Sequence, residues 1–206
     1  MPKAWIQDRK RDYYYKKAKE EKYRSRASYK LSQTIEKYHF IKYGNVVIDL
    51  GAAPGGWMQV AKGIVGNKGF ILGVDLKPFD PFAQKYIRSL IGDIMEPETL
   101  QQILELIPRK ADALISDASP NISGIWEVDH ARQIGLAQRA LEIALETLKP
   151  GGSFFVKVFQ GDLLDDFVRK VRRLFRDVQV IKPQASRPKS SEMYVLAMHL
   201  LHGFSD

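Results

Sequence analysis

Short β-rich runs alternate with amphipathic runs along most of this chain, and this alternation is what most limits the folds it can adopt. Seven runs rich in β-branched and aromatic residues are expected to be strands: 45–50, 69–76, 89–94, 111–118, 152–159, 178–183 and 193–200. Five runs with apolar spacings of about 3.6 residues are expected to be helices: 28–38, 56–65, 97–107, 131–148 and 162–175. Strands separated by helices indicate an α/β fold with a mostly parallel sheet.

The end of the chain departs from this alternation. The last two expected strands follow one another without a helix between them, so we expect a C-terminal antiparallel strand beside the parallel ones. A chain of 206 residues with 45% hydrophobic content suits a single domain with its own core. We assign residues 28–206 to this domain.

The composition argues against membrane proteins, secreted proteins and metalloenzymes. There is no apolar run of about 18 residues and no apolar stretch resembling a signal peptide, so we expect a cytoplasmic protein that makes no membrane contact. The chain has no cysteine, and its four histidines (His39, His130, His199 and His202) lack metal-ligand spacing. We therefore expect no metal site.

Positive charge is concentrated at the N-terminus. Residues 1–30 contain 11 lysines and arginines against four acidic residues, whereas the whole chain has a net charge of +8. The same stretch holds five of the nine tyrosines: Tyr13, Tyr14, Tyr15, Tyr23 and Tyr29. Cations mixed with flat rings suit a phosphate backbone with unpaired bases, so we interpret residues 1–27 as an RNA-binding arm. A solvated basic arm that only aids solubility is the alternative.

A glycine-rich loop directly follows the first expected strand, in the stretch "VVIDLGAAPGGWMQVA" at residues 46–61. Ligands bind at this position in open α/β sheets, and Gly51, Gly55 and Gly56 would let one approach the backbone. The order G-A-A-P-G-G differs from the dinucleotide pattern, and Pro54 lacks an amide donor. Binding of a nucleoside is therefore favoured over binding of a pyrophosphate.

Aspartates end the next three expected strands, at Asp75, Asp93 and Asp117. Because parallel strands end at one sheet edge, these carboxylates should gather beside the glycine loop. Asp75 could accept hydrogen bonds from both ribose hydroxyls, and Asp93 from an adenine amino group. An adenosyl ligand without phosphates fits this set best.

Six motifs together make the chain resemble the FtsJ/RrmJ family of S-adenosylmethionine-dependent RNA ribose 2'-O-methyltransferases. They are "SRASYKL", "DLGAAPGGWMQ", "GVDLKPF", "SDASPNISG", "GGSFFVKVFQG" and "SRPKSSEMYVL", within residues 22–200. The resemblance implies the Rossmann-like, seven-stranded class I methyltransferase fold, with S-adenosylmethionine as cofactor. It also implies a catalytic tetrad, which falls on Lys30, Asp117, Lys157 and Glu192.

The tetrad has a chemical rationale. A ribose hydroxyl is a very weak acid, so a base must take its proton as the oxygen attacks the methyl group. Lys157 lies inside the apolar run "FFVKVF", where loss of water and the nearby cation of Lys30 would favour the neutral amine. Asp117 and Glu192 would orient the two amines, although their charges oppose that effect. Trp57 could shape the methionine end of the cofactor site, or it could be a core aromatic residue.

The choice of RNA is less sharply indicated. The form "GAAPGGW" is similar to family members that methylate a uridine in the A loop of large-subunit rRNA, whereas many tRNA-type members read more like "CAAPGSW". We expect an rRNA substrate within the large ribosomal subunit and a monomeric enzyme. Methylation of a tRNA anticodon loop is the alternative. An inactive RNA-binding protein, a nicotinamide oxidoreductase and a methyltransferase acting on protein or small molecules fit the motifs less well.

Overall fold

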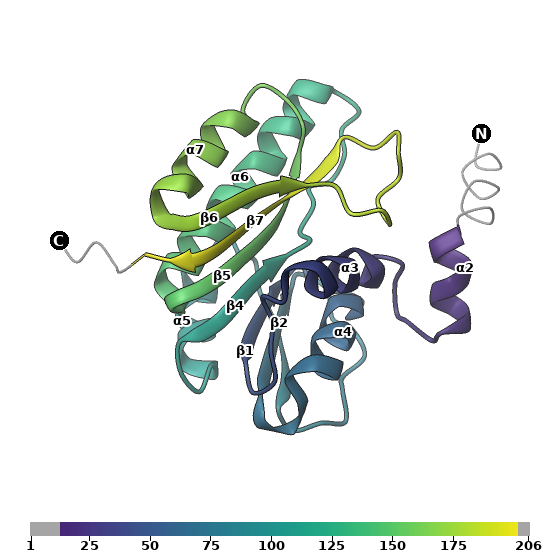
Figure 1. Ribbon diagram of the computed structural model, residues 1–206, viewed down its shortest axis with the longest axis vertical. Helices are drawn as coiled ribbons and strands as arrows, with labels where there is room; N and C mark the ends of the chain where they lie inside the picture. Colours follow the sequence, from purple (N-terminus) through teal and green to yellow (C-terminus); the bar gives the residue numbers. More distant parts are fainter. Residues whose placement is uncertain (1–12, 202–206) are drawn as a thin grey trace.

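The computed structural model describes residues 13–201. The first twelve residues of the predicted arm, and residues 202–206, lie outside the described part. Within it, the fold is a seven-stranded sheet in the order β3-β2-β1-β4-β5-β7-β6, with helices on both faces (Figure 1). The strands are β1 (Val46–Leu50), β2 (Phe70–Asp75), β3 (Ile87–Ile91), β4 (Ala111–Ser116), β5 (Leu148–Phe159), β6 (Phe175–Ile181) and β7 (Glu192–Leu200).

Strand direction agrees with the sequence pattern. The pairs formed among β1, β2, β3, β4 and β5 are all parallel. Strand β7 lies between β5 and β6 and is antiparallel to both. The prediction of a mostly parallel α/β sheet with a C-terminal antiparallel strand is confirmed. Because β7 runs in the opposite direction, its first residues lie at the edge where the parallel strands end.

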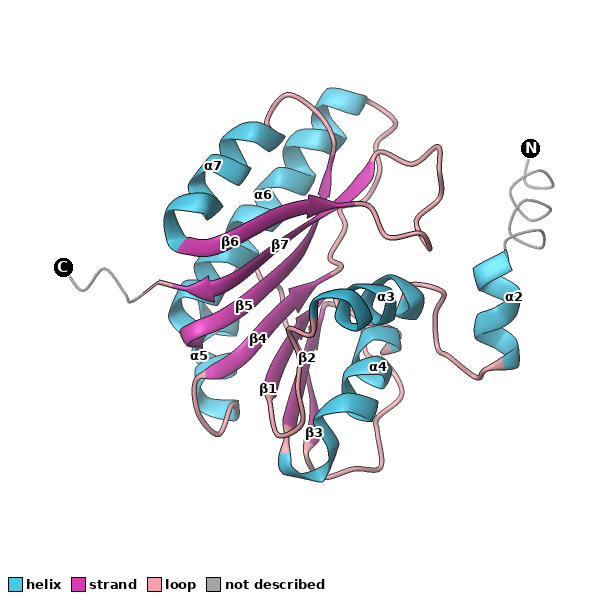
Figure 2. Cartoon of the chain, viewed as in Figure 1, coloured by secondary structure: helices cyan, strands magenta, loops and turns pink. Residues whose placement is uncertain are grey.

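Helices cover the two faces of the sheet unequally (Figure 2). The helices are α2 (Tyr13–Glu20), α3 (Ser28–Tyr38), α4 (Gly56–Val65), the 3₁₀ turn η1 (Gly66–Lys68), α5 (Pro97–Leu106), α6 (Trp126–Thr147) and α7 (Leu164–Leu174). Apolar residues of α5, α6 and α7 form one core with the sheet, and those of α3 and α4 form a second core on the opposite face. The apolar periodicity of each helix thus matches the face that it buries.

Several element boundaries differ from the sequence expectation, among them those of β3, α6, β5 and β6. Strand β3 ends at Ile91, so Asp93 lies in the following turn, where its carboxylate accepts the Met95 amide at 2.9 Å. Aspartate side chains commonly bind nearby backbone amides at turns, and here such a bond takes the place of continued pairing between β3 and β2. Helix α6 begins at Trp126, five residues earlier than the predicted start at residue 131. Strand β5 begins at Leu148 rather than at residue 152, and its pairing register with β4 shifts between Ala111 and Ala113 of β4.

The described part of the arm is packed against the domain. The sequence pattern did not indicate α2, which buries Ala18 in a small cluster with Tyr29 and Ala185. The Tyr14 hydroxyl accepts a hydrogen bond of 3.0 Å from the Gln33 side chain on α3. The basic segment is therefore held beside α3 and the loop that contains Ala185.

No helix within residues 13–201 is both long enough and apolar enough to cross a membrane.

Candidate active site

The ends of the parallel strands bring four of the predicted residues to one cavity. This cavity has a volume of about 310 Å³, which is within the range of small-molecule sites. Gly51 follows β1, Asp75 ends β2, Asp93 follows β3 and Asp117 follows β4. The cavity is lined by Gly51, Ala53, Val74, Asp75, Leu76, Lys77, Gly92, Asp93, Ile94, Asp117, Ala118, Ser119, Asn121 and Leu136.

The three glycines of the loop have different surroundings. A Cβ on Gly51 would lie 2.6 Å from the Ala118 Cα, so only glycine allows the loops after β1 and β4 to approach this closely. Gly55 and Gly56 do not line the cavity. A side chain at Gly55 would meet Arg24, and one at Gly56 would meet Ser25 and Ser28. Their small size allows the segment before α3 to pack on α4, and their predicted contact with the cofactor stays a prediction.

Trp57 lies in the core, which is the alternative that the sequence left open. It is 3% exposed, does not line the cavity, and stacks on Phe155 with ring centroids 5.3 Å apart. Its indole nitrogen donates a hydrogen bond of 2.7 Å to the Ala27 carbonyl. Trp57 therefore joins α4 to the segment before α3.

Asp75 and Asp93 are held by backbone amides. The two carboxylate oxygens of Asp75 accept hydrogen bonds from Ala53 at 2.9 Å and from Lys77 at 2.8 Å. One oxygen of Asp93 accepts the Met95 amide. Each carboxylate keeps further acceptor capacity, because an ionised carboxyl group has about four acceptor positions. Both side chains are thus fixed in position while they remain able to accept bonds from a ligand.

Lys30 and Glu192 form a nearly buried ion pair next to this cavity. Lys30 comes from the first turns of α3 and Glu192 from the start of β7. The Lys30 Nζ lies 2.7 Å from Glu192 Oε1, with 10% and 13% of the respective side chains exposed. The Ser186 hydroxyl donates a further hydrogen bond of 2.9 Å to Oε1 of Glu192.

Lys157 and Asp117 form the second pair. The Lys157 Nζ lies 3.2 Å from Asp117 Oδ1 and donates a hydrogen bond of 2.7 Å to the Asp117 backbone carbonyl. Only 8% of the Lys157 side chain is exposed. An amine this far withdrawn from water, with its direction set by two oxygens, matches the expectation from the run "FFVKVF".

The Tyr194 hydroxyl joins the two pairs, and the sequence analysis missed it. It accepts a hydrogen bond of 3.2 Å from Lys30 Nζ and donates one of 2.7 Å to Asp117 Oδ1. Burial, followed by the charges of Asp117 and Glu192, raises the pKa of Tyr194 well above its usual range. The hydroxyl therefore stays protonated and can donate. A signal was present, since alternate strand residues share a face and Tyr194 lies two residues after Glu192.

Asp117 interacts electrostatically with both lysines and with Tyr194. Burial alone would raise its pKa, but the charges of Lys157 and Lys30 and the hydrogen bond from Tyr194 lower the pKa below its usual value. Asp117 is therefore ionised at neutral pH, binds Lys157 directly and attracts Lys30 through its charge.

Asp49 is a second residue that the sequence analysis missed. It lies in β1 just before the glycine loop and is 1% exposed, and within residues 13–201 its carboxylate oxygens make no hydrogen bond of standard geometry. Burial, then the charges of Asp117 and Asp75, raises its pKa well above the usual range, although the Met58 amide is near enough to lower this pKa slightly. The signal was an acid inside the apolar run "VVIDL". Unpaired buried polar groups are costly and often belong to functional sites.

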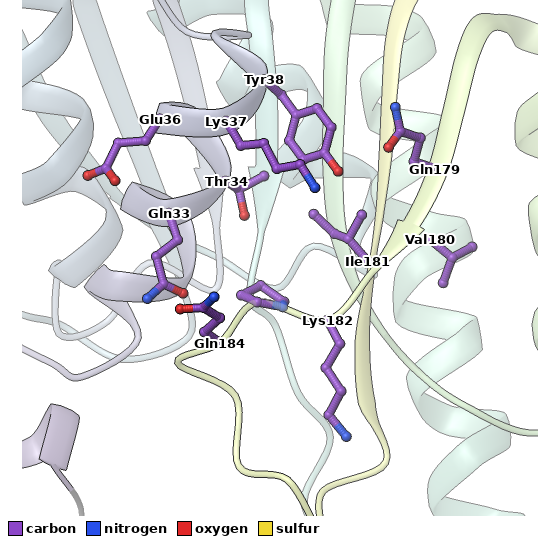
Figure 3. A pocket seen from close by; sticks show the side chains of 11 residues that line it. Gln33, Thr34, Glu36, Lys37, Tyr38, Gln179, Val180, Ile181, Lys182 and Gln184 are labelled. Atoms are coloured by element: carbon purple, nitrogen blue, oxygen red, sulfur yellow. The ribbon is translucent and has the colours of Figure 1, made fainter.

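A larger cavity, of about 740 Å³, lies apart from the predicted residues. Its lining comes from α3 and from the end of β6 with the loop that follows (Figure 3). It contains none of the residues that the sequence singled out for cofactor binding or catalysis.

Comparison with known proteins identifies the family. The pattern that defines FtsJ-like methyltransferases matches residues 23–200. The chain belongs to the FtsJ-like methyltransferase family. Members of this family use S-adenosylmethionine, so the predicted cofactor is confirmed.

Relatives of this FtsJ-like methyltransferase carry specific names. The "Ribosomal RNA large subunit methyltransferase E" of Methanocaldococcus jannaschii is 56% identical over 198 residues, which cover 95% of this chain and 81% of the relative. The protein of the same name from Methanothrix thermoacetophila is 52% identical over 191 residues, covering 93% and 73%.

Solved structures support the same fold. A structure described as a ribosomal RNA methyltransferase from Plasmodium falciparum matches with a TM-score of 0.77 and 27% identity, covering 87% of this chain and 99% of that one. A methyltransferase from Streptococcus mutans, in complex with SAH, matches with a TM-score of 0.52 and 13% identity, covering 85% and 96%. The second likeness concerns the fold alone.

The residues at the cavity fit the cofactor of this FtsJ-like methyltransferase. S-adenosylmethionine has a positively charged ammonium group and a positively charged sulfonium group. Burial, followed by the negative charges of Asp117 and Asp75, raises the pKa of Asp49. A bound cation would offset this repulsion and the desolvation of the Asp49 carboxyl. Leu76 and Ile94 supply apolar walls beside Asp75 and Asp93.

Proposed function

We propose that the protein moves the methyl group of S-adenosylmethionine to a ribose 2'-hydroxyl of RNA, and that the target is a uridine in the A loop of large-subunit rRNA. The observation that carries this proposal is the position of Asp117. It lines the cofactor-sized cavity and also contacts Lys157 and Tyr194. Asp117 alone therefore separates a group bound in the cavity from the buried amine of Lys157.

The chemistry follows from this arrangement. When bound, S-adenosylmethionine would supply a methyl group on a positively charged sulfur. As the C–O bond to the ribose oxygen forms, the bond between methyl carbon and sulfur breaks and the sulfur leaves as a neutral thioether. Lys157, in its neutral form, removes the hydroxyl proton as the oxygen attacks. Asp117 holds the Lys157 amine in place through its carboxylate and its backbone carbonyl. Lys30 stabilises the negative charge that develops on the oxygen. Glu192 anchors Lys30 at 2.7 Å.

Two observations support rRNA over tRNA as the substrate. Relatives at 56% and 52% identity are named for methylation of large-subunit rRNA. The loop also reads "GAAPGGW", the form that resembles the rRNA uridine enzymes. We further propose that the protein acts as a cytoplasmic monomer, with residues 1–27 contributing to RNA affinity.

The test is a map of ribose methylation. The purified protein and S-adenosylmethionine are incubated with large-subunit rRNA, free and within the subunit, taken from a strain that lacks the gene. We expect one new 2'-O-methyluridine in the A loop, detected by mass spectrometry of RNA fragments, and none with the Lys157→Ala variant. Methylation of a base, or of tRNA in parallel reactions, would contradict the proposal.

A further inference from the structure

Two arginines from separate motifs lie around one cavity beside the proposed catalytic groups. Arg26 belongs to "SRASYKL" and Arg187 to "SRPKSSEMYVL", and neither has a role in the chemistry described above. The cavity has a volume of about 280 Å³ and is lined by Arg26, Lys30, Arg187, Ser190 and Glu192. It therefore shares Lys30 and Glu192 with the proposed active site.

The backbone around this cavity is well ordered by hydrogen bonds. Residues 182–191 form the loop between β6 and β7, which extends toward α3 and α2 (Figure 1). The Arg26 guanidinium donates to the Ala185 carbonyl, and the Ala185 amide donates to the Gln33 side chain at 3.0 Å. The Ser190 amide donates to the Arg187 carbonyl at 3.0 Å, which closes a turn.

A lysine braces the same loop from within. The Lys182 ammonium donates hydrogen bonds of 3.0 Å to the Pro188 carbonyl and 2.7 Å to the Ser190 carbonyl. Ala185 is fully buried and Ser186 is 5% exposed, whereas Arg187 is exposed. The loop thus has a buried anchor and presents Arg187 to solvent at the cavity. Preorganised groups bind at lower entropic cost.

The charge around the cavity is strongly positive. Three cationic side chains and one carboxylate line it. The carboxylate, Glu192, already pairs with Lys30 at 2.7 Å. Burial, followed by repulsion from Arg187, lowers the pKa of Arg26, so the two guanidinium groups are close enough to repel. An anion between them would offset this repulsion, and phosphate is the anion that guanidinium geometry matches well.

We propose that Arg26 and Arg187 bind the RNA phosphate on the 3' side of the ribose that is methylated. This inference rests on the proposed function. In RNA the 2'-hydroxyl and the 3'-phosphate are attached to adjacent carbons of one sugar. A 2'-hydroxyl near Lys157 and Lys30 therefore brings that phosphate close to the site, and the cavity that shares Lys30 is the adjacent cationic space. Arg26 and Arg187 are positioning residues that set the ribose in line with the methyl group.

Methylation kinetics with three variants give the first test. Arg187→Ala should lower kcat/KM for RNA by roughly 10- to 150-fold, the range expected for one charged hydrogen-bond partner. It should also reduce the slope of log affinity against log salt by about 0.7 to 0.9. S-adenosylmethionine affinity should not change. Arg187→Lys should keep the salt slope but recover only part of the rate, because an ammonium lacks the planar fork.

The matched control is Lys189→Ala, in the same loop. Lys189 is exposed and does not line the cavity. Any weakening of RNA binding by this variant measures the general electrostatic attraction of a surface cation to the RNA phosphates. Equal losses of kcat/KM in Arg187→Ala and Lys189→Ala would overturn the assignment of a specific phosphate.

Phosphate ethylation interference locates the contact on the RNA. Sparingly ethylated RNA, in the form that the wild type methylates, is selected for binding, and the ethylated positions that prevent binding are mapped. The wild type should exclude ethylation of the phosphate 3' of the target ribose. Arg187→Ala should lose this exclusion and keep the others, and Lys189→Ala should keep it.

The outcomes separate this inference from the proposed function. If the wild type makes no 2'-O-methylated product, the proposed function fails. If the wild type makes the product but ethylation of the 3'-phosphate does not prevent binding, only the phosphate assignment fails. The same holds if this ethylation prevents binding of the wild type and of Arg187→Ala equally. Exclusion at the 5'-phosphate that Arg187→Ala removes would also overturn it, since the contact would then lie on the other side of the ribose.

Discussion

The Tyr194 hydroxyl donates a hydrogen bond of 2.7 Å to Oδ1 of Asp117. Tyr194 lies opposite Lys157 in the antiparallel pair of β5 and β7, so the ladder itself places the phenol beside the proposed base. Through this hydroxyl, the Lys30–Glu192 pair and the Lys157–Asp117 pair form one hydrogen-bonded network. A change at Tyr194 should therefore affect both lysines.

We predict that Tyr194→Phe slows methyl transfer by about tenfold and destabilises the fold by roughly 1 to 3 kcal/mol. The variant leaves Asp117 and Lys30 each without one buried partner, and that is the cost expected of such a loss. Single-turnover methylation and chemical denaturation measure the two effects. An unchanged rate would show that the link through Tyr194 is not used in catalysis.

The same variant has a predictable dependence on pH. The pKa of Asp117 is lowered in the folded protein, so its ionised form stabilises the fold above the unfolded pKa of about 3.9. This stabilisation is lost as the pH falls through the folded pKa. Without the hydrogen bond from Tyr194 the folded pKa rises. The loss of stability on acidification should therefore be smaller in Tyr194→Phe and should be complete at a higher pH than in the wild type, whereas its onset, set by the unfolded pKa, should not change.

Lys157→Ala is expected to keep S-adenosylmethionine and RNA affinity within a few fold and to lose about 10²- to 10⁴-fold in rate, the usual contribution of a general base. Lys157→Arg should not restore activity, because arginine keeps the charge but cannot give up its proton. Single-turnover methylation from about pH 6 to 10 is the measurement. A near-native rate for the arginine variant would indicate that Lys157 acts only through its charge.

Asp49→Asn should change how the stability of the cofactor-free protein depends on pH. Because the pKa of Asp49 is raised in the fold, the unfolded chain releases this proton first, and stability declines as the pH rises above about 4 toward the folded pKa. One proton contributes a slope of about 1.4 kcal/mol per pH unit in this window. The variant should lack this contribution.

Cofactor binding provides the second readout for Asp49. Calorimetry should show weaker S-adenosylmethionine binding to Asp49→Asn, because the amide cannot ionise in response to the positively charged cofactor, as the Asp49 carboxyl can. The pH slope is the safer stability measure, since any fixed cost of burying the amide is the same at every pH. Equal slopes and equal affinities in the two proteins would remove Asp49 from the site.

Removal of residues 1–22 should weaken RNA binding and flatten its salt dependence, while cofactor affinity remains. The deletion removes much of the net positive charge but leaves Lys30 in place. It also removes α2, so a paired change, Lys16→Gln with Lys19→Gln, serves as a control that keeps the buried Ala18. Both positions are exposed. If the truncated protein kept the full-length protein's slope of log RNA affinity against log salt, the arm would serve only solubility.

Local sequence determined the elements and the edge at which the site lies. Period-two and 3.6-residue patterns depend on neighbouring residues, so strands and helices could be predicted before their packing was known. Parallel strands end at a common edge, which is why Gly51, Asp75, Asp93 and Asp117 could be expected to meet. The family motifs implied the tetrad, and the fold brings its four members into one network.

Tertiary packing decided which neighbours these residues have. The "GAAPGGW" motif contains Gly55, Gly56 and Trp57, yet these residues pack against the segment before α3. That segment lies about 30 residues earlier in the chain, and only the tertiary fold places it against α4. The place of Tyr194 depends on the register between β5 and β7. Arg26 and Arg187 meet at one cavity only because the loop after β6 docks on the segment before α3. A side chain's partners depend on contacts between distant segments, whereas its secondary structure depends largely on near ones.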